Sequence, residues 1–173
     1  MKSLTFLFSL LLLGFVLSCG GGEQPPADEG EPPQSMIEEE ETPESIAEGK
    51  GIGAVENVEI TDTIDMQMVE MGRSIYEMKC AACHKLTDQR VVGPGWAGIT
   101  NKRKPEWIMN MITNVEVMLA EDPEAQALLE ECLTRMPNQN ISIGDARAIL
   151  EFMRHNDRER VGQSDQAIEE MEG

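Results

Sequence analysis

The chain has 173 residues, a formal net charge of −18 at pH 7 and an aromatic content of only 4%. This length leaves room for one domain with flanking tails. The charge is unevenly placed: residues 19–49 contain ten acidic residues and no basic one, whereas residues 66–160 contain fourteen acidic and twelve basic residues. The expected folded part is therefore nearly neutral, and this pattern excludes nucleic-acid binding.

The first eighteen residues are typical of an export signal. Lys2 precedes an apolar run over residues 4–17, which is too short for a comfortable membrane span. The run ends at Cys19, before three glycines, and this end resembles a bacterial lipoprotein signal, in which the cysteine becomes the acylated first residue of the mature chain. We expect acylation of Cys19 to anchor the protein to a membrane. An ordinary cleaved signal followed by an unrelated cysteine is the alternative.

Residues 19–64 are expected to form an acidic tether. The stretch is rich in glutamate, proline and glycine, and such a composition cannot bury enough apolar surface to offset the entropy of ordering. Like-charge repulsion and the prolines would keep it extended. The apolar residues between 51 and 64 could instead form a short extended arm. A folded domain is expected over residues 65–157, followed by a polar tail over 158–173.

The domain is predicted to be all-α, with about four to five helices, because its apolar residues recur at helical spacing. A first helix is expected over residues 65–79. Its expected apolar stripe consists of Met68, Met71, Ile75 and Met78. Pro105 and Pro123 indicate the first turns of two further helices. A capping box that begins at Ser142 predicts a last helix that ends near Asn156.

Cys80, Cys83 and His84 form a Cys-x-x-Cys-His motif, which is the attachment signature of a c-type haem. The two thiols would bond to the two vinyl groups of the porphyrin, and the imidazole would become the proximal ligand. A redox dithiol or half of a zinc site is the alternative for a Cys-x-x-Cys pair. Zinc is disfavoured because the chain has only two histidines and no second cysteine pair, and a thioredoxin-like site because no βαβ pattern surrounds the motif. We therefore predict one haem c, attached through Cys80 and Cys83.

Met136 is the best candidate for the second axial ligand. It stands directly before Pro137, in a segment expected to be non-helical, and the proline would restrain the backbone that presents the thioether. Histidine with methionine is a known ligand pair for c-type haem. The alternative is that Met136 fills the core, as methionine often does. The rival ligands are Met109, Met111, Met118 and His155.

Three other features have structural and functional interpretations. Trp107 is expected to pack in the core or against the haem wall rather than to donate to a propionate. The basic residues 102–104 are expected to be a solvated helix start, with a docking patch as the alternative. Cys132 is expected to be a buried thiol, with an intermolecular disulfide as the alternative.

Taken together, the sequence resembles class I bacterial cytochromes c over residues 66–156. The resemblance rests on Gly72, Tyr76, the Cys-x-x-Cys-His motif, Gly93-Pro94, Gly98, Met136-Pro137 and the helix from Asp145 to Phe152. It implies a small helical fold around one haem, in which the first and last helices cross and Gly72 packs against Phe152. It also implies that the carbonyl of Pro94 accepts a hydrogen bond from His84 and so orients the imidazole. Trp96 departs from the pattern, since leucine is more usual there.

The same resemblance implies an electron carrier rather than an enzyme. We expect a lipid-anchored protein on the periplasmic side of a bacterial membrane that carries single electrons between respiratory partners, such as a quinol-oxidising complex and a terminal oxidase or denitrification reductase. Partners would dock transiently at the haem edge. Nothing in the sequence specifies an oligomeric state. The alternative function is a haem-based ligand sensor or a catalytic haem subunit with a displaceable methionine, although no further histidine supplies a polar distal group.

Overall fold

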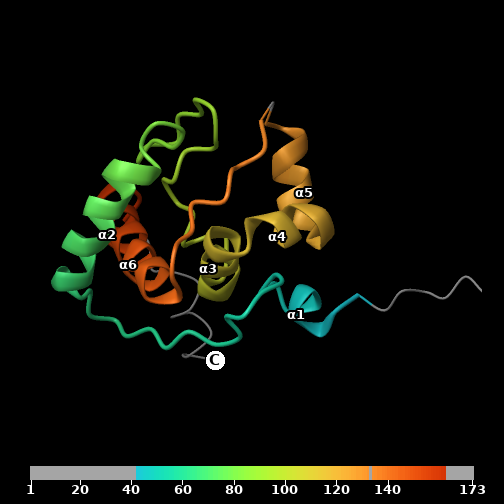
Figure 1. The fold of residues 1–173 in the computed structure, drawn as a ribbon. Helices are drawn as coiled ribbons and strands as arrows, with labels where there is room; N and C mark the ends of the chain where they lie inside the picture. Colours follow the sequence, from blue (N-terminus) through green and yellow to red (C-terminus); the bar gives the residue numbers. More distant parts are fainter. Residues whose placement is uncertain (1–41, 133, 163–173) are drawn as a thin grey trace, which may run out of the picture. The chain divides into compact units, whose positions relative to one another are not determined.

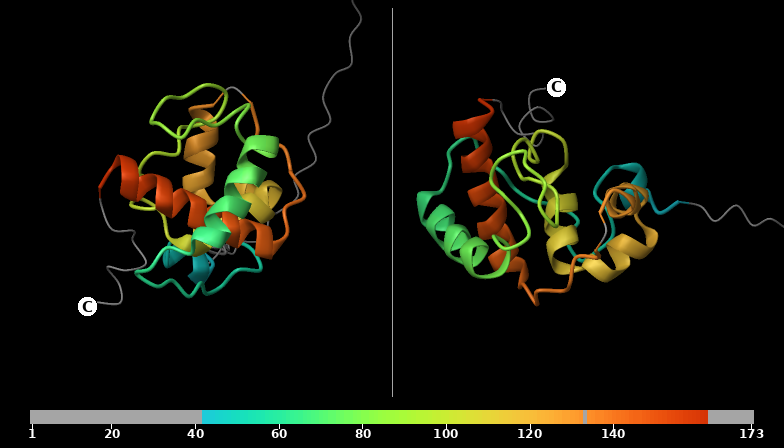
Figure 2. Two further views of the ribbon diagram at one scale, coloured as in Figure 1. Left: turned by 90° about the vertical axis from the view of Figure 1, so that its left-hand side faces the viewer. Right: turned by 90° about the horizontal axis from the view of Figure 1, so that it is seen from above.

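Helix α2 (Met66–Lys79) and helix α6 (Ile143–Arg160) cross each other and pack together (Figures 1 and 2). This computed structural model describes residues 42–132 and 134–162. The carboxylate of Asp65 caps α2 by accepting hydrogen bonds from the first-turn backbone. The hydroxyl of Ser142 caps α6 by accepting from the backbone N–H of Asp145, which confirms the predicted helix start.

Gly72 makes the close approach of α2 to α6 possible. A Cβ atom at this position would lie 2.1 Å from the carbonyl oxygen of Ala148 and 2.9 Å from the Cβ of Phe152. Any other residue would force the two helices apart, because backbone atoms of α6 occupy that space. The expected packing of Gly72 against Phe152 is confirmed.

The buried face of α2 differs from the predicted methionine stripe. The helix buries Val69, Gly72 and Tyr76, whereas Met71 and Met78 are 48% and 74% exposed. The reason is that α2 meets α6 along the narrow strip that contains Gly72, so side chains on the neighbouring strip lie outside the contact. The apolar stripe that the spacing indicates is therefore not the face that α2 buries.

Three short helices form the middle of the fold. They are α3 (Pro105–Thr113), α4 (Val115–Glu121) and α5 (Pro123–Glu130). The predicted starts at Pro105 and Pro123 are confirmed, and the carboxylate of Asp122 caps α5. Helix α3 packs against α6 and α4, and α4 packs against α5. The sequence did not indicate a separate α4: the chain breaks at Asn114, whose side-chain amide donates to the backbone carbonyl of Ile52.

Residues 50–64 form an arm that packs on the helices, and the expectation of a tether up to residue 64 is corrected here. A short helix, α1 (Glu44–Ala47), precedes the arm. Val55 and Ile60 of the arm are buried in the core. The ribbon shows the arm running from α1 to α2 beneath α3 and α6 (Figure 1). Residues 1–41, with the predicted signal and Cys19, lie outside the described residues.

The arm is fixed to the helices by hydrogen bonds from buried side chains. The side chain of Asn110 donates to the carbonyl oxygens of Lys50 and Val55 and accepts from the N–H of Val55, all at 2.9 to 3.0 Å. Arg154 donates to the carbonyl of Thr61 at 2.6 Å. These partners lie far away in the sequence, which is why composition alone did not predict the order of this segment.

Helix α6 continues past its predicted end to Arg160. Asn156 and Asp157 are buried, and the carboxylate of Asp157 accepts hydrogen bonds from the backbone N–H groups of Gly98 and Thr100. Tertiary contacts therefore extend a helix whose sequence had become polar. Residues 163–173 of the predicted tail lie outside the described residues.

The described residues form six helices and no strand, apart from an isolated antiparallel bridge between His84 and Arg90. The all-α prediction is confirmed. Among the residues described, none of the helices combines the length and apolarity that crossing a bilayer requires.

Candidate haem-binding site

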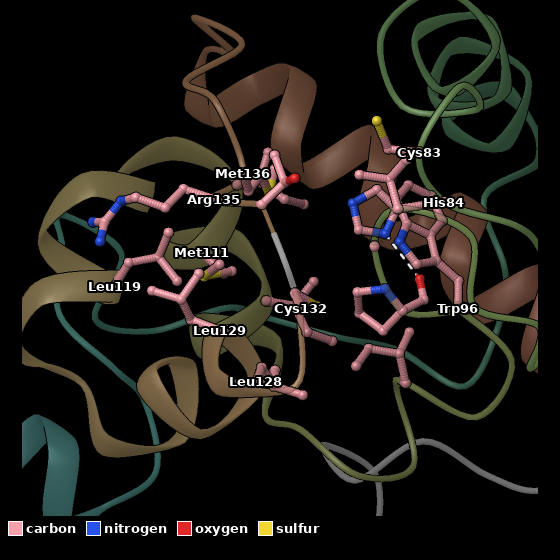
Figure 3. A pocket seen from close by; sticks show the side chains of 18 of the residues that line it. Cys83, His84, Trp96, Met111, Leu119, Leu128, Leu129, Cys132, Arg135 and Met136 are labelled. Carbon is pink, nitrogen blue, oxygen red and sulfur yellow. Dashed lines mark hydrogen bonds between the residues drawn. The ribbon is translucent and has the colours of Figure 1, made fainter.

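A largely apolar cavity of about 400 Å³ lies between the Cys-x-x-Cys-His segment and the helices α3 to α5 (Figure 3). Cys83, His84 and Trp96 line one side of the cavity, and the segment that ends at Met136 and Pro137 lines another. The aliphatic walls come from α3, α4, α5 and α6. Their lining residues include Ile108, Met111, Ile112, Leu119, Leu128, Leu129 and Met153. An apolar cavity with a few polar groups is typical of a cofactor site.

A hydrogen bond from the imidazole ring holds His84 in one orientation. Its Nδ1 lies 2.9 Å from the carbonyl oxygen of Pro94, the bond that the resemblance implied (Figure 3). A carbonyl can only accept, so Nδ1 carries the proton and Nε2 is left with a free lone pair. A hydrogen bond of this kind fixes both the tautomer and the direction of a ligating imidazole.

The loop after the motif encloses the imidazole closely. A Cβ at Gly93 would lie 2.4 Å from Cε1 of His84 and within 2.9 Å of both ring nitrogens. The backbone N–H of Gly93 donates to the carbonyl of Cys83 at 3.0 Å, which keeps the loop in place. Glycine is therefore required at position 93 because a side chain there would clash with the imidazole. The backbone angle of Gly93 is not the reason.

Aromatic side chains support His84 from the side of α2. The Tyr76 hydroxyl donates to the backbone carbonyl of His84 at 2.8 Å. The Trp96 ring is buried, with its centroid 4.9 Å from that of Tyr76 and 5.6 Å from that of His84. Trp96, the departure from the resemblance, thus forms part of the imidazole support rather than disturbing it.

Burial lowers the pKa of His84 below its ordinary value of 6.5, and the hydrogen bond to Pro94 opposes this shift only in part. The neutral imidazole is therefore favoured at neutral pH. Neutral imidazole is the form that binds a metal through its free nitrogen.

Met136 is half-buried on the wall of the cavity and lies across it from His84 in Figure 3. It belongs to the non-helical chain between α5 and α6, as the sequence predicted. Of the rival ligands, Met109 and Met118 are buried outside the cavity lining, and the sulfur of Met118 accepts from the N–H of Ile52 at 3.1 Å. Met111 does line the cavity, so it remains the alternative to Met136 as the second ligand.

His155, the other rival, lies on α6 beside Glu159, with 3.6 Å between Nε2 and the carboxylate. It is not among the residues that line the cavity. The structure thus brings together Cys83, His84, Pro94 and Met136, while Cys80 caps the C-terminal end of α2 beside them.

Comparison with known proteins identifies the family of the chain. The cytochrome c family matches residues 69–157, about half of the chain. The chain belongs to the cytochrome c family. The structure of cytochrome c from Rhodothermus marinus is similar, with 33% sequence identity, a TM-score of 0.62, and coverage of 68% of this chain and 99% of that one.

Two structures of an engineered form of that Rhodothermus marinus cytochrome c also match. Their TM-scores are 0.61 and 0.59 at 33% and 34% identity, and each match covers 67% of this chain and 98% of the other. The second of them is bound to a carbene intermediate. No relative matches among curated proteins.

As a cytochrome c, this chain is an electron-transfer haem protein that binds one haem c covalently through a cysteine pair, Cys80 and Cys83. The residues fit that group: the cavity is apolar, a thiol and an oriented imidazole open onto it, and Gly93 leaves space for the imidazole. The haem assignment from the motif is confirmed.

Trp107 forms part of the cytochrome's cavity wall, in agreement with the packing interpretation. Its indole N–H donates to the buried carboxylate of Asp122 at 3.1 Å. The same oxygen of Asp122 accepts from the N–H of Ala125 and caps α5. Helix-cap rules do not indicate this partner of the tryptophan, because the two residues belong to different helical segments.

Two further features of the cytochrome differ from the sequence interpretation. Within residues 102–104, the Arg103 guanidinium lies 4.9 Å from the Trp107 ring centroid and pairs with Glu124, so it is partly internal rather than simply solvated. Cys132 is half-buried rather than buried, and it lines the haem cavity four residues before Met136. The pattern of a single extra cysteine contained no signal for this position.

Proposed function

We propose that this cytochrome c uses His84 and Met136 as its two axial ligands and works as an electron carrier whose iron keeps both ligands. The observation that carries the proposal is the placement of an oriented imidazole and a thioether on facing walls of one apolar cavity. Both side chains come from segments that neighbouring structure restrains: His84 by Pro94 and Tyr76, and Met136 by the adjacent Pro137.

The bound haem supplies a one-electron redox centre. The protein contributes attachment through Cys80 and Cys83, orientation of the imidazole through Pro94, and exclusion of water by the aliphatic side chains of α3 to α5. A thioether opposite histidine favours the reduced state, and an apolar surrounding acts in the same direction. If the iron keeps both ligands, its coordination would change little between the oxidised and the reduced state. A small change of this kind favours rapid electron transfer.

We also propose that the protein is exported and lipid-anchored through Cys19 on the periplasmic side of a bacterial membrane. Support comes from the apolar run over residues 4–17 and the cysteine and glycines that follow it. Covalent haem attachment in bacteria takes place after export, so the Cys-x-x-Cys-His motif independently supports the same compartment.

Redox partners would dock transiently at the haem edge. Val91 and Val92, in the loop after the motif, are 49% and 43% exposed, and Val92 lines the cavity. A small apolar contact of this kind allows brief encounters with little buried area. A quinol-oxidising complex as donor and a terminal oxidase or denitrification reductase as acceptor follow from family analogy alone.

The ligand assignment is tested by comparing Met136→Leu with Met111→Leu in the full-length holoprotein. Both variants remove a sulfur from the cavity wall with little change in volume. We expect Met136→Leu to lose the near-infrared sulfur-to-iron band and to lower the reduction potential in a spectroelectrochemical titration, whereas Met111→Leu keeps both. The reverse pattern would make Met111 the ligand. An open sixth position in the wild type would favour ligand sensing or catalysis instead.

A further inference from the structure

Two cationic side chains reach from the haem-motif side of the cavity to the segment that carries Met136. Arg90 donates from Nη1 to the backbone carbonyl of Glu131 at 2.6 Å and also pairs with the Glu131 carboxylate. Lys79 donates from Nζ to the backbone carbonyl of Gln139 at 3.0 Å. Glu131 precedes Met136 and Gln139 follows it, so the two contacts flank the thioether.

Both cations are attached firmly to the haem motif. Lys79 is the last residue of α2 and directly precedes Cys80. Arg90 forms an isolated antiparallel bridge with His84, and the loop that contains it is closed by the bond from Gly93 to Cys83. Each contact therefore links the Met136 segment to the side that holds the imidazole.

The segment they reach has little helical support of its own. Helix α5 ends at Glu130 and α6 begins at Ile143, and the chain between them is non-helical where it is described. Arg135 and Pro137, on either side of Met136, are exposed. Contacts at the two ends of such a segment therefore have a direct influence on whether Met136 stays in place.

We propose that Arg90 and Lys79 are positioning residues that clasp the Met136 segment to the haem motif and slow the departure of the thioether. The inference rests on the proposed role of Met136 as an axial ligand. The Arg90 and Glu131 side chains are 40% and 59% exposed, so added salt screens their attraction. Retention of Met136 thus depends on ionic strength in a way that a wholly buried ligand loop would not show.

The test measures how fast imidazole binds to the iron of the oxidised, full-length holoprotein, followed by the shift of the main haem absorption band, which every variant has. Arg90→Gln and Glu131→Gln should each accelerate displacement about threefold, the scale of an exposed ion pair, and Lys79→Gln should act in the same direction. The double variant of Arg90 and Glu131 should be no faster than Arg90→Gln alone, because Arg90→Gln already removes both contacts with Glu131. The rate should depend less on salt in Arg90→Gln and Glu131→Gln, which lose the ion pair, than in the wild type. Lys79→Gln should keep the wild-type salt dependence, because Lys79 contacts a neutral backbone carbonyl.

Glu70→Gln is the matched control. Glu70 is an exposed glutamate that pairs with an arginine, Arg73, but on α2 and away from the Met136 segment. Its displacement rate should equal that of the wild type. Unchanged rates in Arg90→Gln and Lys79→Gln, or an equal acceleration in Glu70→Gln, would overturn the proposal.

Met136→Ala separates this inference from the function on which it rests. If Met136→Ala binds imidazole much faster than the wild type while the clasp variants do not, the ligand assignment stands and the clasp is wrong. If Met136→Ala and the wild type bind imidazole equally fast, Met136 is not the ligand, and both proposals fail.

Discussion

At the scale of single residues, the imidazole of His84 is positioned by contacts that each have a different physical origin. A backbone carbonyl, that of Pro94, selects the tautomer, and the Tyr76 hydroxyl holds the backbone of the histidine itself. Gly93 contributes by having no side chain. For the proposed role of His84 as an iron ligand, these contacts fix the tautomer and the direction of the ring.

Gly93→Ala should disturb this arrangement, because its Cβ would be 2.4 Å from the imidazole. We expect a loss of about 2 kcal/mol in the free energy of unfolding, as for other overpacked sites, together with a shifted haem spectrum. Denaturant unfolding of the holoprotein and its optical spectrum measure the two effects.

Gly144→Ala is the control for this substitution. It lies in α6, and its nearest neighbour to an added Cβ is 3.9 Å away. Alanine in a helix is favoured over glycine by roughly 0.5 to 1 kcal/mol, so this variant should be as stable as the wild type or slightly more stable. Equal behaviour of the two variants would contradict the steric role of Gly93.

At the scale of the elements, the arm over residues 50–64 is part of the cytochrome fold although it precedes the matched family region. The arm is attached at Asn110, which is 1% exposed and makes three hydrogen bonds to arm backbone. Buried backbone groups must be paired, so a single amide side chain supports a stretch that has no helix or strand of its own.

Asn110→Ala should therefore detach the arm. Loss of three buried hydrogen bonds predicts a decrease of about 3 kcal/mol in the free energy of unfolding. Limited proteolysis should cut within residues 50–64 before the rest of the domain. The exposed Gln126→Ala is the control and should change stability by less than about 0.5 kcal/mol. Resistance of the arm in Asn110→Ala would show that its apolar contacts suffice.

A buried ion pair joins the start of α2, the arm and α6. The carboxylate of Glu151 accepts from Arg147, from Arg154 and from the backbone N–H of Asp65, and both Glu151 and Arg154 are fully buried. Burial by itself would raise the pKa of Glu151, but these hydrogen bonds outweigh it and lower the pKa below 4.5. The ionised carboxylate is therefore favoured by folding.

Glu151→Gln should lower the free energy of unfolding by about 3 kcal/mol at pH 7, because it removes the charge of the carboxylate that the buried Arg154 contacts. Because the folded-state pKa is depressed, this stability is present above pH 4.5 and is lost as the pH falls through the folded-state value. The difference between wild type and variant should therefore shrink in denaturant titrations at lower pH. A constant difference would contradict the charged state of Glu151, and the exposed Glu159→Gln serves as the control.

Local sequence signals predicted much of this fold. The prolines at 105 and 123 and the cap at Ser142 act on their own neighbours, so their effect can be read from adjacent residues. The Cys-x-x-Cys-His motif likewise predicts haem attachment from five consecutive residues.

Features set by distant contacts were not predictable in the same way. The burial of Val55 depends on Asn110, and the true inner face of α2 depends on Ala148 of α6. The contact of Arg90 with Glu131 joins residues from two different loops. In each case the deciding partner lies far along the chain, beyond the reach of periodicity and capping rules.

At the scale of the whole molecule, the charge is concentrated outside the haem domain. Residues 19–49 contain ten acidic residues and no basic one. The proposed lipid on Cys19 and this acidic stretch would keep a nearly neutral redox domain close to a membrane without binding the domain itself to anionic lipid.

Cys19→Ser tests that anchor. In fractionated cells, the wild type should sediment with membranes, and the variant should move to the soluble fraction or fail to be processed. Haem content and optical spectrum of the domain should not change, because the cavity residues are untouched. A variant that remains membrane-bound after complete processing would show that another part of the chain or a partner holds the protein there.

The most direct test of the central claim is an optical spectrum of the purified full-length holoprotein, oxidised and then reduced, with and without carbon monoxide. Ligation by His84 and Met136 predicts a weak near-infrared band when oxidised, a sharp low-spin spectrum when reduced, and no change on addition of carbon monoxide. A high-spin reduced spectrum that shifts with carbon monoxide would contradict it, since the sixth position would then be open and the protein would be suited to sensing or catalysis.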